Sequence, residues 1–240
     1  MDLPSLRPWF GALLDLFYPP HCGSCGIFLI PEHQVPGLCG DCFRDIEEPP
    51  SPCCSVCSHR LEGNLACPNC AGRTWRLTSV VAASSLTGSV RGLLHRFKYG
   101  RERWLAVSLG GLFVRAMRDP RIAEVSFDAL VPVPLHPVKE REREFNQAGL
   151  LAGRLSRELG VPVRRWLSRT RMTPAQAGSG REERMRNLEG AFRVRGTMPP
   201  GTRILVVDDV CTTGSTLDAC AAALKEGGAS EVFAVVVARG

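Results

Sequence analysis

The spacing of hydrophobic positions changes twice along this sequence and divides it into three parts. In residues 1–20, apolar side chains recur every three or four positions, which predicts a short amphipathic helix that two prolines would end. Residues 21–75 are rich in Cys, Gly and Pro and have no helical or strand period, so they cannot build a core alone. Residues 79–240 alternate apolar runs with helical patterns, which predicts one larger domain.

The third part combines buried strands with amphipathic helices. Apolar runs predict strands over residues 79–86, 128–135, 191–194, 203–209 and 232–238. Helical spacing predicts helices over residues 90–98, 104–117, 147–159 and 217–225. A polar, Arg-rich stretch over 164–190 predicts a long mobile loop of the kind that closes over active sites. Strands that alternate with helices pair in parallel, so the predicted fold class is α/β, with a mostly parallel sheet flanked by helices.

The second part carries a repeated cysteine pattern. Nine of the eleven cysteines fall between positions 22 and 70, and eight of them form four Cys-x-x-Cys turns. Each turn directs two thiolates at one point, and two turns supply the tetrahedral four-sulfur shell that Zn²⁺ prefers. The predicted ligands of two structural zinc ions are Cys22, Cys25, Cys39, Cys42, Cys54, Cys57, Cys67 and Cys70. The four turns could pair sequentially or in a cross-braced order, and both fit the spacing. An iron–sulfur cluster is the alternative to zinc, and Cys53 could replace Cys54 as a ligand.

Composition and charge narrow the class of protein. About 44% of residues are hydrophobic, which is enough for a packed core. No apolar run approaches the roughly 18 residues that span a bilayer, and the first twenty residues lack the pattern of an export signal. Clustered cysteines therefore indicate a cytoplasmic metal protein rather than a disulfide-bonded one. The net charge of +6 suits polyanionic ligands such as pyrophosphate or nucleic acid.

The strongest chemical pattern follows the strand predicted over 203–209. Two acidic residues end this strand, and a loop of hydroxyl side chains and glycine leads into a helix. Ligands of open α/β sheets bind at that edge, where loop N–H groups and a helix N-terminus can surround a phosphate. Carboxylates there can accept hydrogen bonds from sugar hydroxyls or hold Mg²⁺ through water. The predicted contacts are Asp208, Asp209, Thr212, Thr213, Gly214, Ser215 and Thr216. Cys211 has no nearby His to activate it, which favours a small loop residue over a nucleophile.

A second anion site is predicted after the strand over 128–135. A basic loop and a helix N-terminus follow this strand, and the candidate pyrophosphate contacts are Lys139, Arg141, Arg143, Asn146 and Gln147. A basic lid further along could stabilise the charge of departing pyrophosphate, and its candidates are Arg169, Arg171, Gln176 and Arg184. The plain alternative for both stretches is a solvated basic surface.

The order of these patterns resembles the ComF family of competence-related proteins. The paired Cys-x-x-Cys turns are followed by Phe97-Lys98-Tyr99-Gly100, Val131 to His136, Arg143 to Ala148 and the acidic loop. That loop resembles the phosphoribosyl pyrophosphate (PRPP) loop of type I phosphoribosyltransferases. There the acidic pair holds the ribose hydroxyls and the Thr-Thr-Gly-Ser-Thr loop holds the 5-phosphate. One departure is Glu144, where members of the family commonly have Gly; its carboxylate would repel pyrophosphate unless it points away.

The resemblance implies a double zinc ribbon over residues 21–75 and a type I phosphoribosyltransferase domain over 79–240. It implies a cytoplasmic protein of DNA uptake or utilisation that binds PRPP with Mg²⁺, or a related ribose 5-phosphate. The implied partners are single-stranded DNA and a competence helicase. One alternative is an active phosphoribosyltransferase on a small acceptor such as a nucleobase. The other is a non-catalytic adaptor for single-stranded DNA or a helicase, with stacking side chains among Trp75, Tyr99, Trp104 and Trp166, which could equally be core residues.

Overall fold

The computed structural model describes residues 21–29, 35–63, 66–172, 188 and 190–240. The helix predicted for residues 1–20 lies outside this part of the chain, as do the lid candidates Gln176 and Arg184. None of the helices in the described ranges is both long enough and apolar enough to cross a membrane.

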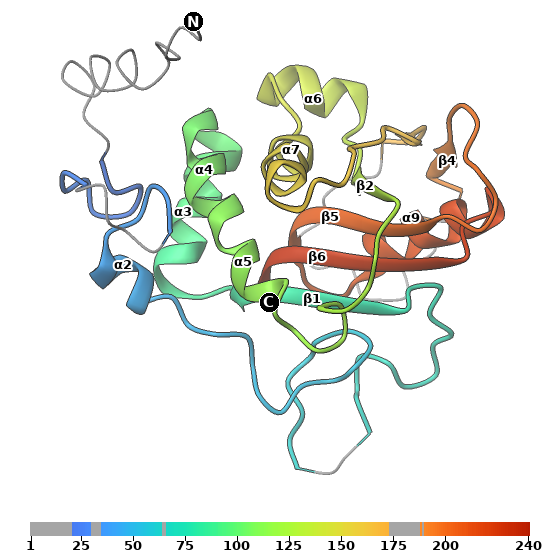
Figure 1. The fold of residues 1–240 in the computed structure, drawn as a ribbon, viewed down its shortest axis with the longest axis horizontal. Coiled ribbons are helices and arrows are strands. Elements are labelled where there is room, and N and C mark those ends of the chain that lie inside the picture. The colour runs from blue at the N-terminus through green and yellow to red at the C-terminus, as the bar shows by residue number, and fades with distance from the viewer. Residues whose placement is uncertain (1–20, 30–34, 64–65, 173–187, 189) are drawn as a thin grey trace, which may run out of the picture.

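A parallel sheet forms the centre of the molecule (Figure 1). Its strands lie in the order β1 (Ser79–Ser85), β6 (Glu231–Arg239), β5 (Arg203–Cys211) and β2 (Ala129–Pro132), and every neighbouring pair is parallel. A parallel bridge between Leu130 and Val163 adds one further pairing beside β2. The predicted α/β class with a parallel sheet is therefore confirmed. The order also places the carboxyl ends of β2 and β5 next to each other.

Helices cover both faces of the sheet, because side chains alternate between faces along each strand. Leu205 and Val207 of β5 pack into the core under α3 (Gly88–Tyr99) and α7 (Gln147–Leu159). Their neighbours Ile204 and Val206 pack into the opposite core, under α9 (Ser215–Glu226). The antiparallel pair β3 (Leu167–Arg169) and β4 (Phe192–Val194) extends that second layer. Both faces are thus apolar, as the near-continuous hydrophobic strands require.

Three predictions for local structure were wrong, and the first two concern a loop and a helix. The loop expected over 164–190 contains strand β3, because Leu167 pairs with Val194 across the antiparallel ladder. The helix expected over 104–117 is divided into η1 (Arg103–Leu105), α4 (Ala106–Gly111) and α5 (Phe113–Ala116).

The interruption of that helix follows from close packing at two glycines. A Cβ atom on Gly110 would lie 2.7 Å from Cγ of Arg154 on α7, and one on Gly111 would lie 2.7 Å from Cγ1 of Val35. Glycine is therefore needed for contact, but glycine also weakens a helix. The helix therefore breaks after Gly111, where the two glycines allow α4 to pack closely against Arg154 and Val35.

The stretch after β2 is the third difference, because a basic loop was predicted there. It forms a short helix, α6 (Pro137–Arg143), whose first residue is a proline. His136 precedes the helix, and its Nδ1 accepts a hydrogen bond from the backbone N–H of Val138 at 3.3 Å. Proline at the first helical position together with a capping side chain starts a helix, and here both cues outweigh the Pro-rich appearance of the segment.

The cysteine-rich segments lie at two separate places on this domain (Figure 1). The first surrounds α2 (Gly40–Arg44) and lies beside α3 and α4, where Ser108 Oγ donates to the carbonyl of Gly37 at 3.0 Å. The second lies along the free edge of β1, where the N–H of Val80 donates to the carbonyl of Val56 at 2.7 Å. The outer edge of the sheet is therefore covered by this second segment.

Candidate functional site

The eight predicted zinc ligands form two four-sulfur groups. The structure groups them sequentially, as Cys22, Cys25, Cys39 and Cys42, and as Cys54, Cys57, Cys67 and Cys70. Within the groups, Sγ of Cys25 lies 3.7 Å from Sγ of Cys39, and Sγ of Cys54 lies 3.6 Å from Sγ of Cys70. Tetrahedral zinc with bonds of about 2.3 Å spaces its sulfurs about 3.8 Å apart. The geometry fits two closed zinc shells without cross-bracing, and Cys53 is in neither group.

Backbone N–H groups are directed at the sulfurs of the first group. The N–H of Cys39 donates to Sγ of Cys22 at 3.3 Å, and the N–H of Cys42 donates to Sγ of Cys39 at 3.4 Å. Burial raises the pKa of Cys22, but hydrogen-bond donors, the largest of them the backbone N–H groups of Cys25 and Cys39, outweigh it and lower this pKa to about 6. Such donors stabilise the thiolate, which is the form that binds metal.

The acidic pair lies at the carboxyl end of β5, as the sequence analysis expected. Oδ1 of Asp208 accepts a hydrogen bond from the N–H of Asp209 at 2.9 Å. Burial raises the pKa of Asp208 to about 7, and the charge of Asp209 acts in the same direction. Asp209 is itself buried and forms an ion pair with Nζ of Lys98, 2.9 Å from its Oδ1. Lys98 comes from the last turn of α3 and was not among the site residues predicted from the sequence.

A pocket of about 160 Å³ opens beside this pair, between the carboxyl ends of β2 and β5. Its polar lining is Lys98, Arg143, Asn146, Gln147, Arg169, Asp208, Asp209 and Thr216. Three cations therefore face two carboxyl groups in one small space. Burial lowers the pKa of Arg169, and the nearby Asp208 opposes that change. A surplus of positive charge that remains beside buried carboxylates suits a ligand with a phosphate and a set of hydroxyls.

Gln147 contributes a buried donor to this pocket. Its side chain is 2% exposed, and its Oε1 accepts a hydrogen bond from Nη1 of Arg143 at 3.2 Å. Its Nε2 has no hydrogen-bond partner within the described part of the chain. A buried donor without a partner costs about 1–3 kcal/mol, so a ligand oxygen or a water is expected there. Asn146 beside it is already engaged, because it donates to the carbonyl of Val133 at 3.0 Å and caps α7 through Gly149.

The predicted phosphate loop joins β5 to α9. Gly214 has a φ of 75°, in the left-handed region that glycine adopts without strain, and it immediately precedes the helix. Oγ1 of Thr213 lies 3.0 Å from Oγ of Ser215, so two hydroxyls gather at the turn. The first N–H groups of a helix have no intrahelical acceptor and are available to an anion. Burial raises the pKa of Cys211 to about 11, which agrees with a loop residue rather than a nucleophile.

Other predicted site residues lie outside the pocket lining. Lys139 and Arg141 are on α6, where Lys139 forms an ion pair with Glu142 at 2.9 Å, and Arg141 is exposed. Arg171 is also exposed, just beyond β3. The structure thus brings Arg143, Asn146, Gln147 and Arg169 to the acidic pair, but not these three. Of the predicted phosphate loop, Thr216 lines the pocket, and Thr212, Thr213, Gly214 and Ser215 lie outside the lining.

Glu144 has a backbone conformation that glycine adopts without strain. Its φ is 66°, in the left-handed region, and it ends α6 in that conformation. Its carboxylate forms an ion pair with Arg101 at 2.5 Å, on the surface rather than in the pocket lining. Glu144 therefore keeps its negative charge away from the anion site.

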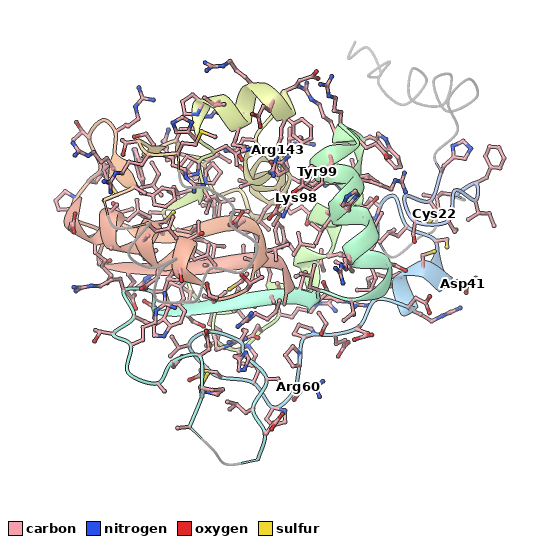
Figure 2. The ribbon with its side chains drawn as sticks, turned by 180° about the vertical axis from the view of Figure 1, so that it is seen from behind. Cys22, Asp41, Arg60, Lys98, Tyr99 and Arg143 are labelled. Carbon is pink, nitrogen blue, oxygen red and sulfur yellow. The ribbon has the colours of Figure 1, made fainter. Side chains whose placement is uncertain are left out.

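Two aromatic side chains are exposed on or just after α3, and Tyr99 lies beside the pocket residue Arg143. Tyr99 is 65% exposed and Trp104 is 48% exposed, whereas Trp75 is packed against the phosphate loop. The guanidinium of Arg143 lies 5.3 Å from the centre of the Tyr99 ring, and Figure 2 shows Lys98, Tyr99 and Arg143 together. The guanidinium of Arg96 lies 5.7 Å from the Trp104 ring. This combination of exposed rings and cations is typical of surfaces that bind single-stranded nucleic acid.

Comparisons with known proteins found matches for both the cysteine-rich part and the α/β part of the chain. Residues 13–71 match the double zinc ribbon domain family, and residues 146–240 match the phosphoribosyl transferase domain family. Competence protein F of Haemophilus influenzae is 32% identical over 202 residues, which cover 82% of this chain and 87% of the relative. DNA utilization protein YhgH of Salmonella typhimurium is 30% identical, over 90% and 96% of the two chains. Competence protein ComFC of Bacillus subtilis is 26% identical, over 84% and 82%.

Proposed function

The chain belongs to the family of competence protein F, ComFC and YhgH, and from this premise we propose that it binds PRPP with Mg²⁺, or a related ribose 5-phosphate, in DNA uptake or utilisation. The observation that carries the proposal is the meeting of a phosphate loop, an acidic pair and three cations at one sheet edge. A single ligand with a 5-phosphate, ribose hydroxyls and a pyrophosphate would match all three parts.

Each part of the site has a distinct task in this proposal. The loop from Thr212 to Thr216 surrounds the 5-phosphate, and Asp208 with Asp209 accepts hydrogen bonds from the ribose hydroxyls. Arg143 and Arg169 face the pyrophosphate, where planar guanidinium groups bind two oxygens at once. The acidic pair and the pyrophosphate oxygens are the hard ligands that Mg²⁺ prefers. Although Lys98 already occupies Oδ1 of Asp209, a carboxylate has acceptor sites left for a hydroxyl.

Displacement of pyrophosphate by a nitrogen acceptor would need little covalent help from such a site. Holding the ribose and balancing the charge on the leaving pyrophosphate lower most of the barrier. The described residues do not identify an acceptor, so pyrophosphate release on addition of a nucleobase remains the test of turnover. Binding itself is the first question.

Calorimetric titration with PRPP, with and without Mg²⁺, tests the binding site. Joint replacement of Asp208→Asn and Asp209→Asn should abolish binding without unfolding the protein. Arg143→Gln should weaken binding about 10- to 100-fold, because it removes a charge-assisted hydrogen bond. Arg141→Gln is the matched control, since it lies on the same helix outside the pocket lining. Unchanged affinity in the double Asp variant would refute the site.

A second function, contact with single-stranded DNA, is favoured by the exposed Tyr99 and Trp104. Base stacking on an aromatic side chain contributes about 1–3 kcal/mol, so Tyr99→Ala and Trp104→Ala should each weaken binding of an oligothymidine. Val107→Ala serves as a control, because Val107 is exposed nearby without an aromatic ring. Fluorescence anisotropy over a range of salt concentrations would measure this, with a steep salt dependence expected. Equal affinities in all three variants would exclude stacking at this surface.

A further inference from the structure

The second cysteine group contacts the phosphate loop directly. Asn69, between Cys67 and Cys70, donates from Nδ2 to the carbonyl of Thr213 at 3.4 Å. Arg73, just beyond the group, donates from Nη1 to the same carbonyl at 2.9 Å. In a trans peptide the C=O and the following N–H point in opposite directions. Two donors that hold the Thr213 carbonyl toward the cysteine group therefore hold the Gly214 N–H away from it.

The start of α9 is held by the same segment. The Arg73 side chain is 3% exposed, and its Nη2 lies 3.2 Å from Oδ2 of Asp218, in the first turn of α9. Oδ1 of Asp218 accepts hydrogen bonds from the N–H groups of Arg76 at 2.7 Å and Leu77 at 3.3 Å. The helix N-terminus next to the loop is thus anchored by the residues that follow the cysteine group, across a gap of about 140 positions in the sequence.

Trp75 packs against the backbone of the phosphate loop at Gly214. A Cβ atom on Gly214 would lie 2.6 Å from Cη2 of Trp75, so the ring lies directly against the loop backbone. The guanidinium of Arg73 stacks on this ring, 3.6 Å from its centre. The loop therefore has a rigid wall made by two side chains that come from the cysteine-rich segment.

The opposite end of the loop is also tied to the second group. The buried Arg239 donates from Nε to the carbonyl of Cys57 at 3.1 Å, and from Nη1 to the carbonyl of Cys211 at 3.0 Å. One guanidinium thereby joins a predicted zinc ligand to the residue that begins the loop. The first cysteine group makes its contacts elsewhere, for example with α3, where Arg96 Nη1 donates to the carbonyl of Gly23 at 2.6 Å.

We infer that the second cysteine group, when it holds zinc, positions the phosphate loop through Asn69, Arg73 and Trp75, and that the first group does not. Zinc in the second group then sets the affinity for a 5-phosphate ligand, although neither the metal nor its thiolates touch that ligand. The statement about affinity rests on the function proposed above. The statement about the loop rests on the contacts alone.

Matched cysteine variants separate the two groups. Cys70→Ser and Cys42→Ser each remove the last ligand of one group, so each should reduce bound zinc from two ions to one. Calorimetry with PRPP and Mg²⁺ should show at least about a fivefold loss of affinity for Cys70→Ser, the low end of coupling between sites. Cys42→Ser should bind as the unaltered protein does. Equal losses in both variants would overturn the inference.

A second variant that keeps both zinc ions tests the same contact if Cys70→Ser does not fold. In Arg73→Lys, one ammonium cannot hold the Thr213 carbonyl and Asp218 while it also stacks on Trp75. We expect full zinc content and at least about a fivefold weaker PRPP affinity. Arg121→Lys is the control, because Arg121 Nη1 donates to Ser58 Oγ, to the carbonyl of Cys54 and to the carbonyl of Val80 on β1, and Arg121 does not contact the loop. It should lower stability without lowering affinity.

Hydrogen exchange of the loop amides is the readout that needs no ligand. Exchange over residues 211–216 should rise in Cys70→Ser and Arg73→Lys, and stay unchanged in Cys42→Ser and Arg121→Lys. If the unaltered protein binds no PRPP, the proposed function fails while exchange still decides whether the loop is coupled to the second group. If PRPP binds equally to all variants and loop exchange does not change, this inference fails and the proposed function stands.

Discussion

Replacement of Asp208 by Asn should stabilise the folded protein at pH 8 while it weakens the ligand site. The pKa of Asp208 is raised from 3.8 to about 7, chiefly by burial and then by Asp209. Between these two values the folded state keeps a proton that the unfolded chain has released, so stability is complete below about pH 4 and falls as the pH rises through 7. A shift of this size corresponds to at most about 4 kcal/mol.

The expected gain is smaller than this limit. Asp208 as a residue is half-buried and lines the open pocket, so we expect about half of that free energy, or about 2 kcal/mol at pH 8. An Asn side chain can still accept the hydrogen bond from the N–H of Asp209. The gain should fall to less than about half of its full value at pH 5, where Asp208 is protonated in the folded protein.

Urea denaturation of both proteins at pH 5, 6, 7 and 8, at a fixed free zinc concentration, measures this difference. Because both proteins contain the same cysteines, the difference between their free energies of unfolding at each pH does not include the contribution of the cysteines. Asp119→Asn is a control of opposite sign, because a hydrogen bond from Arg121 lowers the pKa of Asp119. Its contribution to stability is present above the unfolded pKa and is lost as the pH falls, so this variant should be less stable at pH 8. An Asp208→Asn gain that does not vary with pH would refute the reasoning.

Three further predictions concern the loop, the left-handed turn and the metal. Gly214→Ala should lose about 1–3 kcal/mol in urea denaturation, because of its φ of 75° and the 2.6 Å approach to Trp75; an unchanged midpoint would contradict this. Glu144→Gly should gain about 0.5–1 kcal/mol in the same assay, since an exposed ion pair with Arg101 offsets little of the left-handed strain. Plasma mass spectrometry should find two zinc ions per chain, and a value near zero after purification without chelator would exclude the ribbons.

Features encoded by neighbouring residues were predictable from the sequence. Helix α7 has the predicted bounds, because Asn146 caps its start and Gly160 ends it in the left-handed conformation. The acidic pair and the loop after it follow from one continuous segment, and the four Cys-x-x-Cys turns are visible as one repeated spacing. Each of these depends on residues a few positions apart, whereas the spacing left sequential and cross-braced grouping of the turns open.

Features that depend on distant contacts were not predictable. Lys98 ends a surface helix in sequence, and only the packing of α3 beside the sheet brings its ammonium to Asp209. The division of α4 from α5 depends on Arg154 and Val35, which no local pattern connects with Gly110 and Gly111. Side-chain spacing shows which face of an element is apolar, but it does not show which partner meets that face.

The strand order also dictates when the sheet can form during synthesis. Strands β1 and β5 are not neighbours; each pairs with β6, which the ribosome makes after both (Figure 1). A nascent chain therefore carries β1 with its inner edge open, while the second cysteine group, made earlier, can cover part of the outer edge. Open apolar strands invite aggregation. We therefore expect cells starved of zinc during synthesis to accumulate this protein in an insoluble form.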